Sequence, residues 1–527
     1  MPDARPDAGA DEGILDAAKG GGIAFAGRVF TWTARLGLAV LLARLLGADE
    51  YGLYNLALTV ATVMASFPSL GLDSALVRFM AVYSSRGDLG RLRGSLQIGI
   101  GIPLILSVLV GIVLFFAAEL IATGIMHDPR LTPLLQIASV LVPATVLNRQ
   151  LAAALQGLRR LGDAVRAEQF AQPASRVIML LAIAAFGLTA AWAVAASALA
   201  ALVATLLMIL LLSRAAGAIR GVLASRETRA LTSHAVPVFF SNVVNTFGGN
   251  LQTLFLGAMS SAASVGVFAI ANQITLVGSM FHQSVAASSM PVFAEYADRG
   301  DRSGSERLYR ITSKWTFTLN LPLFCLVLVF PDAFLALFGR EFEAGSTALI
   351  ILAWGALANA ATGTSGAILD MAGHTRVKFL NSTLSLGLAI GLSLMLIPPL
   401  GIVGAAIAAV GSVALVNLLR VLEVALLVRI TPYDVGWLKP ILAGALGLGA
   451  GLLAATLVGG SDTVAGFAAG AIALLAVYAA VVFALGISDD DRMVLGRAGR
   501  KITRIGRKRG RRTGSAKPVL ESDRHER

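Results

Sequence analysis

The first apolar stretch of the chain carries two arginines, Arg28 and Arg35, with Thr31 between them. On a helix, spacings of three, four and seven residues place these side chains on one face. Two guanidinium groups side by side offer paired N–H donors that match a pyrophosphate. Charged side chains inside a membrane span are costly and are functional candidates by default. We therefore predict that this face binds an anionic ligand. The alternative for Arg28 is that it reaches the headgroups.

Two later apolar segments carry uncharged polar side chains at helical spacing. The first stripe consists of Asn242, Asn245, Gly249 and Gln252. The second consists of Asn272, Ser279 and His282. Amide and hydroxyl groups suit the hydroxyls of a glycan. We predict that both stripes line a binding cavity, whereas the alternative is hydrogen bonding between packed helices.

Arg78 and Lys314 are isolated cations near the ends of apolar segments. Arg78 follows Asp73 by five residues, and this spacing does not align the two side chains on a helix. Lys314 is the first cation near the membrane in the second half of the chain. Both are predicted substrate ligands, with an interfacial position as the alternative for Lys314.

Bond-making chemistry has no visible site in the sequence. It contains no G-x-x-x-x-G-K-[S/T] motif for ATP and no H-E-x-x-H metal motif. Five scattered histidines suggest no Ser-His-Asp set, and Cys325 is the single cysteine. We therefore predict a protein that is not an enzyme, with no catalytic residues, no cofactor and no metal site.

The composition excludes a soluble enzyme and a disordered chain. Of 527 residues, 56% are hydrophobic and only 14% are charged, whereas soluble domains carry about 25% charged residues. A spanning helix needs roughly 20 apolar residues. The sequence predicts an all-α polytopic membrane protein with about fourteen spans. They are 22–46, 52–76, 95–118, 131–154, 171–189, 191–213, 234–258, 264–290, 313–338, 346–369, 378–398, 402–428, 440–459 and 464–486.

The basic residues of the loops indicate an orientation. With a cytosolic N-terminus, the loops after even-numbered spans are rich in Arg and Lys, and the other loops offer only Arg130 and Arg340. Cytosolic loops carry this excess. An even number of spans then places the basic tail, residues 487–527, in the cytosol, where it is predicted to meet anionic headgroups rather than nucleic acid. The acidic first residues do not read as a cleaved signal peptide.

An internal repeat divides the chain. Tyr51-Gly-Leu-Tyr-Asn-Leu-Ala57 aligns with Val265-Gly-Val-Phe-Ala-Ile-Ala271, and Arg86-Gly-Asp88 with Arg299-Gly-Asp301 in nearly the same register. An even number of helices per repeat gives both copies the same orientation. The predicted units are a cytosolic segment 1–21, a first lobe 22–213, a linker 214–233, a second lobe 234–428, two extra helices 440–486 and the tail 487–527.

The chain resembles the polysaccharide-transport branch of the multidrug/oligosaccharidyl-lipid/polysaccharide exporter superfamily, which includes Wzx-type O-antigen flippases. The resemblance rests on Ala43-Arg-Leu-Leu-Gly-Ala-Asp-Glu-Tyr-Gly-Leu-Tyr54, on Gly71-Leu72 and on Leu155-Gln-Gly-Leu-Arg159. It implies two six-helix bundles around a V-shaped central cavity, with two additional C-terminal helices. It also implies a flippase that moves a polyisoprenoid-pyrophosphate-linked oligosaccharide across the bacterial inner membrane by alternating access.

The expected partners follow from this resemblance. They are a lipid-linked oligosaccharide as substrate, membrane lipids, and the polymerase and glycosyltransferases of a surface polysaccharide such as lipopolysaccharide or exopolysaccharide. Nucleic acid is not expected. A cation-coupled antiporter of the same superfamily is the alternative, although the first span carries arginines and no acid. A flippase for the lipid-linked cell-wall precursor is a second alternative.

Overall fold

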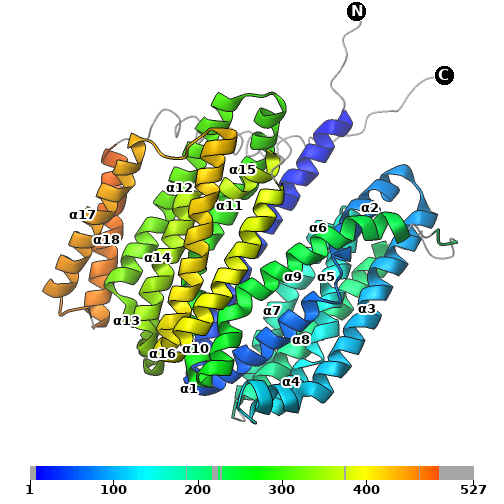
Figure 1. The fold of residues 1–527 in the computed structure, drawn as a ribbon, viewed down its shortest axis with the longest axis horizontal. Coiled ribbons are helices and arrows are strands. Elements are labelled where there is room, and N and C mark those ends of the chain that lie inside the picture. The colour runs from blue at the N-terminus through cyan, green and yellow to red at the C-terminus, as the bar shows by residue number, and fades with distance from the viewer. Residues whose placement is uncertain are drawn as a thin grey trace, which may run out of the picture.

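In the computed structural model, the described residues are 8–184, 187–215, 223–225, 228–372, 375–461 and 463–485. Every regular element among them is a helix. Figure 1 shows two helical bundles that converge at one end of the molecule and separate toward the other. The all-α membrane fold predicted from the composition is therefore confirmed.

The first lobe is built from the helices before residue 216. They are α1 (Ala8–Ser66), α2 (Leu72–Arg86), α3 (Leu89–Glu119), α4 (Leu131–Ala138), α5 (Leu141–Gly157), α6 (Leu161–Val165), α7 (Gln172–Ala184) and α8 (Ala190–Ala215). The π-helical turns η1 (Leu120–Ile125) and η2 (Arg166–Ala171) continue α3 and join α6 to α7.

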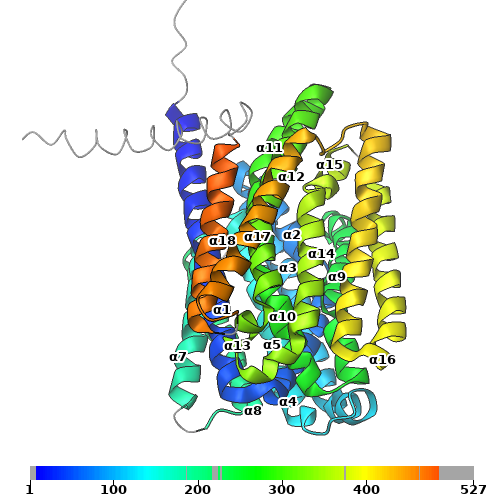
Figure 2. The same cartoon turned by 90° about the vertical axis from the view of Figure 1, so that its left-hand side faces the viewer.

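The second lobe and the extra helices follow. They are α9 (Thr228–Met259), α10 (Ala262–Thr275), α11 (Val277–Asp298), α12 (Arg302–Val329), α13 (Pro331–Ala336), α14 (Ser346–Thr362), α15 (Ser365–Met371), α16 (Thr375–Glu423), α17 (Leu438–Leu457) and α18 (Val464–Ala484). The short turns η4 (Arg340–Gly345), η5 (Val424–Val428) and η6 (Val435–Trp437) connect them. Figure 2 shows α17 and α18 side by side on the outer side of this lobe, where α17 packs on α12.

Nine segments of the described residues are long and apolar enough to cross a membrane. Two of the longest helices contain a break at a glycine with a positive φ, at Gly47 in α1 and at Gly401 in α16. Residues other than glycine rarely adopt these angles, so each glycine lets the chain turn sharply. The count of fourteen spans and the domain limits stay predictions. The tail 487–527 and residues 216–222 and 226–227 of the linker 214–233 lie outside the described residues.

The two lobes touch where α1 turns and α10 begins. Gly52 of α1 and Gly266 of α10 face each other so closely that a Cβ on Gly52 would lie 1.7 Å from the Ala262 carbonyl oxygen. A Cβ on Gly266 would lie 2.1 Å from the Ala48 carbonyl oxygen. These glycines occupy equivalent positions of the internal repeat, so the two copies meet each other at this crossing.

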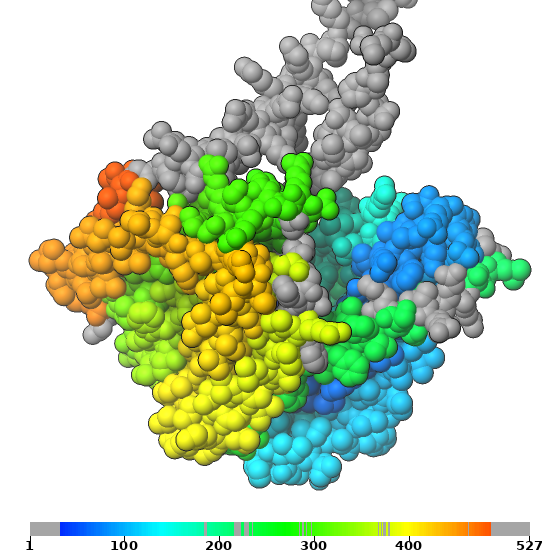
Figure 3. All heavy atoms as spheres, turned by 45° about the horizontal axis from the view of Figure 1, so that its top comes forward, coloured from blue at the N-terminus to red at the C-terminus, as the bar shows by residue number. Residues whose placement is uncertain are grey.

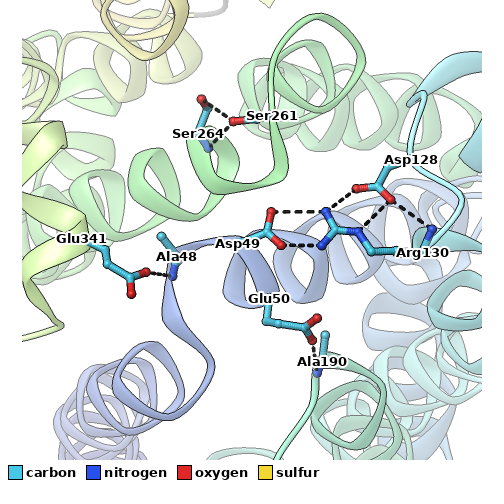
Figure 4. A network of polar contacts seen from close by, with 9 residues as sticks. All are labelled: Ala48, Asp49, Glu50, Asp128, Arg130, Ala190, Ser261, Ser264 and Glu341. Carbon is cyan, nitrogen blue, oxygen red and sulfur yellow. Dashed lines mark hydrogen bonds and ion pairs between the residues drawn. The ribbon is translucent and has the colours of Figure 1, made fainter.

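Polar contacts surround this crossing (Figure 4). Arg130, in the loop before α4, contacts Asp49 at 2.5 Å and Asp128 at 2.8 Å. The two carboxylates raise the pKa of Arg130, and its hydrogen bonds lower the pKa of Asp128. Between the lobes, Ala48 N–H donates to Glu341 at 2.8 Å. This hydrogen bond joins the two lobes at this end, and the Arg130 contacts fix the first-lobe side of the crossing.

Candidate functional site

A cavity of about 450 Å³ opens in the first lobe and reaches across to α9. Its lining residues come from α2, α5, η2, α7 and α9, and they are Asp73, Ser74, Val77, Thr145, Asn148, Arg149, Ala152, Ala153, Gln156, Glu168, Gln172, Val238 and Asn242. Polar groups dominate this list. Figure 3, with the separated end of the lobes turned toward the viewer, shows the blue and cyan first lobe facing the green-to-orange second lobe.

Helix α5 supplies one wall of the cavity. Residues at positions 145, 148, 149, 152, 153 and 156 follow helical spacing and so share a face. The wall is fixed from behind, because Asn148 donates to the Ala201 carbonyl at 3.2 Å and accepts from the Thr205 hydroxyl at 2.9 Å. Anchoring to α8 therefore sets the position at which Arg149 enters the cavity.

Charged side chains meet around Glu168 on η2. The charges of Arg149 and Arg35 both act on the Glu168 carboxylate. Arg149 comes from α5 and Arg35 from α1, so three elements bring their charges to one place. The Glu168 side chain is exposed, as is that of Arg35. The arrangement is a cavity that water reaches and in which fixed charges face one another.

Arg176 extends this cluster. It lies two turns after Glu168 on the same helical face, beyond Gln172. Its guanidinium carbon lies 5.6 Å from the centroid of the Tyr54 ring, a distance typical of a cation–π contact. The charge of Arg35 opposes that of Arg176. The Nε of Arg176 is buried and has no hydrogen-bond partner among the described residues.

The second lobe contains an uncharged cavity of about 250 Å³. Its polar lining includes Asn272, Ser279, His282, Asn320 and Asn359, from α10, α11, α12 and α14. An amide of α16 supports it, since Asn417 donates to the Asn359 side-chain oxygen at 2.9 Å. Buried Nδ1 of His282 has no partner among the described residues. Amides and hydroxyls here offer both donors and acceptors to a neutral polar ligand.

The predicted residues fall into several places. Arg35 belongs to the charged cluster, and Asn242 lines the first cavity. Asn272 and His282 line the second cavity. The side chains of Arg28 and Thr31 lie outside the described residues.

Four other predicted positions are not among the residues that line these two cavities. Asn245 is exposed and Gln252 is buried, so the stripe on α9 does not form one continuous wall. Arg78 is exposed, with its guanidinium 5.8 Å from the centroid of the neighbouring Phe79 ring. Lys314 lies in a separate cavity between α12 and α17.

Arg149, Glu168 and Arg176 are absent from the residues predicted above. Their signal is present in the sequence, because Arg149 falls within the expected span 131–154 and Arg176 within 171–189. The rule that makes an intramembrane charge a functional candidate applies to them as it does to Arg35. The order of the chain does not reveal that α1, α5 and α7 bring these charges together.

Comparison with known proteins defines the family. The model of the polysaccharide biosynthesis protein family matches residues 17–297, more than half of the chain. The chain belongs to this family, which confirms the resemblance drawn from the sequence. The MatE family model matches residues 237–395, within the second lobe.

One curated relative is a probable low-salt glycan biosynthesis flippase, Agl15 of Haloferax volcanii. It is 25% identical over 196 residues, and the match covers 37% of this chain and 42% of the relative. The chain thus spans less than half of that protein in the alignment.

Solved structures share the fold. The lipid II flippase MurJ, in an inward closed conformation, has a TM-score of 0.69 and 16% identity, covering 87% of this chain and 98% of MurJ. An inward-facing transporter of the multidrug family has a TM-score of 0.59 and 16% identity, covering 75% and 98%. A transporter from Pyrococcus furiosus has a TM-score of 0.54 and 16% identity, covering 77% and 95%. All three establish the fold.

Proposed function

We propose that this protein is a flippase for a polyisoprenoid-pyrophosphate-linked oligosaccharide, the repeat unit of a surface polysaccharide. In this proposal the headgroup crosses the bacterial inner membrane through the space between the lobes, and both termini lie in the cytosol. Family membership supports the substrate class, because the matching model describes polysaccharide biosynthesis proteins. Polymerase and glycosyltransferases are proposed partners on the same ground.

The observation that carries the proposal is the arginine cluster. Arg35 and Arg176 repel each other, and the buried Nε of Arg176 has no partner among the described residues. A buried donor without an acceptor costs about 1–3 kcal/mol. A pyrophosphate supplies acceptor oxygens and negative charge together. It would therefore accept a hydrogen bond from Arg176 and offset the repulsion between the two arginines.

Alternating access is the proposed mechanism. The lobes separate at the end where α1 begins and α18 ends (Figure 1), and they join at the Gly52–Gly266 crossing. Rocking of one lobe against the other would break the contact between Ala48 and Glu341 and expose the cluster to the opposite side. The uncharged cavity of the second lobe, with Asn272 and His282, is the proposed place for sugar hydroxyls.

A complementation experiment tests the proposal. Deletion of the gene should cause the lipid-linked oligosaccharide to accumulate and the surface polymer to disappear. Wild-type protein should restore the polymer, whereas Arg149→Ala and Arg176→Ala should not. Each removes charge-assisted hydrogen bonds worth about 1.5–3 kcal/mol, so flipping in proteoliposomes should fall roughly 10- to 150-fold.

Arg166→Ala is the matched control. Arg166 lies near the cluster in the sequence, but its side chain is exposed and pairs with Asp163 at 3.0 Å. It should restore the polymer fully. Normal polymer without accumulation in the deletion strain would refute the flippase proposal. Accumulation of the lipid-linked cell-wall precursor with lysis would indicate the second alternative, and cation-dependent drug efflux without either change would indicate the antiporter.

A further inference from the structure

A third cavity lies away from the arginine cluster, between α12 and the start of α17. Its volume is about 450 Å³. Four basic side chains line it, Arg307, Arg310 and Lys314 from α12 and Lys439 from α17. Two carboxylates, Glu306 and Asp434, are the acids of the lining. The cavity thus carries an excess of positive charge that the proposed transport path does not use.

The loop that carries η6 is fastened over this cavity. Arg310 donates to the Thr431 carbonyl at 3.4 Å, and it also donates to Glu306 at 2.6 Å. Arg302, at the start of α12, donates to the Arg429 carbonyl at 3.1 Å. These hydrogen bonds tie the connection between the second lobe and α17 to α12. The cavity is therefore a built feature of the fold, with walls from two separate segments.

Aromatic rings mark the depth of the cavity in the membrane. Trp437 packs against Phe317 and Tyr433 with ring centroids 4.9 Å and 5.1 Å apart. Its indole N–H donates to the Pro432 carbonyl at 2.9 Å. Trp and Tyr concentrate at the headgroup level of a bilayer. Trp437 is buried, but Tyr433 is exposed beside the basic cavity, and it places the cavity at the membrane–water interface.

Apolar side chains continue from the cavity along the outside of the protein. Leu438 and Leu442 of α17 lie one turn apart, and Leu442 follows Lys439 by three residues and so lies near it on the helix. Both leucines are exposed. A basic pocket above an exposed apolar face matches a molecule with an anionic head and acyl chains. Inorganic phosphate would occupy only the basic cavity and would leave the apolar face uncovered.

We propose that this cavity binds the phosphate headgroup of an anionic phospholipid of the surrounding membrane. Lys314 and Lys439 approach the phosphate from opposite walls, and Arg307 and Arg310 add charge from α12. Basic pockets between membrane helices recognise anionic headgroups in this way. The acyl chains lie along α17, so the lipid holds the extra helices against the second lobe. The inference is independent of the transported substrate.

The test is a binding titration on the full-length protein, purified in a neutral detergent. Fluorescently labelled phosphatidylglycerol and its phosphatidylcholine analogue are titrated separately, and binding is followed by anisotropy. The wild-type protein should bind the phosphatidylglycerol at least 10-fold more tightly. The double variant Lys314→Gln/Lys439→Gln should weaken that binding about 10- to 30-fold. Asp434→Asn should strengthen it.

Matched variants show whether weaker binding comes from removal of the site or from misfolding of the protein. Arg166→Gln/Arg299→Gln removes two exposed charges that pair with Asp163 and Glu295, and it should bind as the wild type does. Lys314→Arg/Lys439→Arg keeps the charge and should retain binding. Equal affinity for both lipids, or unchanged binding in the Gln double variant, would overturn the proposal.

Competitors identify the source of the phosphate. Inorganic phosphate and soluble pyrophosphate at millimolar concentration should leave the phosphatidylglycerol bound. Displacement by either would show a site for soluble anions and overturn the lipid assignment. Arg149→Ala should bind phosphatidylglycerol normally, so this result does not depend on whether the protein flips an oligosaccharide.

Discussion

Replacement of Gly52 by alanine should push the lobes apart at the end where they meet. The new methyl group would lie 1.7 Å from the Ala262 carbonyl oxygen, and ordinary contact begins at 3.4 Å. Because this oxygen belongs to the backbone of α10, no side-chain rotation relieves the clash. Helix α10 has to withdraw by roughly 1.7 Å. Overpacking of this kind costs about 1–3 kcal/mol, which favours the state that opens here by about 5- to 150-fold.

A cysteine reporter measures this opening. Cys325 is replaced by serine, and Val265→Cys places a thiol at a position of α10 that is fully buried. A membrane-impermeant maleimide then reports how often the crossing opens. Gly52→Ala should raise the labelling rate at least fivefold.

Gly37→Ala is the control for this measurement, since it makes the same change in the same helix where a Cβ meets no atom within 4 Å. It should leave the labelling rate at the value of the parent protein. Equal labelling of the two alanine variants, both monodisperse after purification, would refute the idea that the glycine contact holds this end closed.

Three other contacts can be tested separately. Hydrogen bonds from Arg130 lower the pKa of Asp128 below 3.8, so their stabilisation is present above that pH and is lost as the pH falls through the lowered pKa. The thermal midpoint should therefore fall more steeply on acidification than in Asp128→Asn, and parallel curves would contradict this. Asn381 donates to Glu423 at 2.6 Å, so Asn381→Leu should lower stability by about 1–3 kcal/mol, with partial recovery on adding Glu423→Gln; an unchanged thermal midpoint would argue against it. Cys325 is buried and should react with maleimide only after unfolding, as followed by mass; rapid native labelling would disagree with the packing of α12 on α17.

The class of fold follows from the sequence because apolar length is a property of the chain alone. A run of about 20 apolar residues predicts a span wherever it lies. The repeat likewise aligns Gly52 with Gly266. That these two glycines touch is a property of three-dimensional packing, and helical periodicity specifies which face a residue occupies without specifying the neighbouring helix.

The candidate site was predictable only in part, for the same reason. Asn242 lines the first cavity and the charge of Arg35 acts on Glu168 there, but Arg149 and Arg176 join Arg35 only because α5 and α7 pack beside α1. Lys314 is a cation near the membrane, as its position in the sequence indicates, yet α17 encloses it in a different cavity. Spacing within one helix does not show which of the cavities a charged side chain lines.

The crossing of Gly52 and Gly266 has a consequence for how such a chain can evolve. Repeats that have fused into one chain normally diverge independently, because a change in one copy leaves the other unaffected. Here the backbone around each glycine is the surface against which the other glycine rests. A side chain added at either glycine would clash with the backbone of the other copy, so each position limits which residues the other can accept. A substitution at either glycine therefore disturbs the same contact between the two halves of the protein.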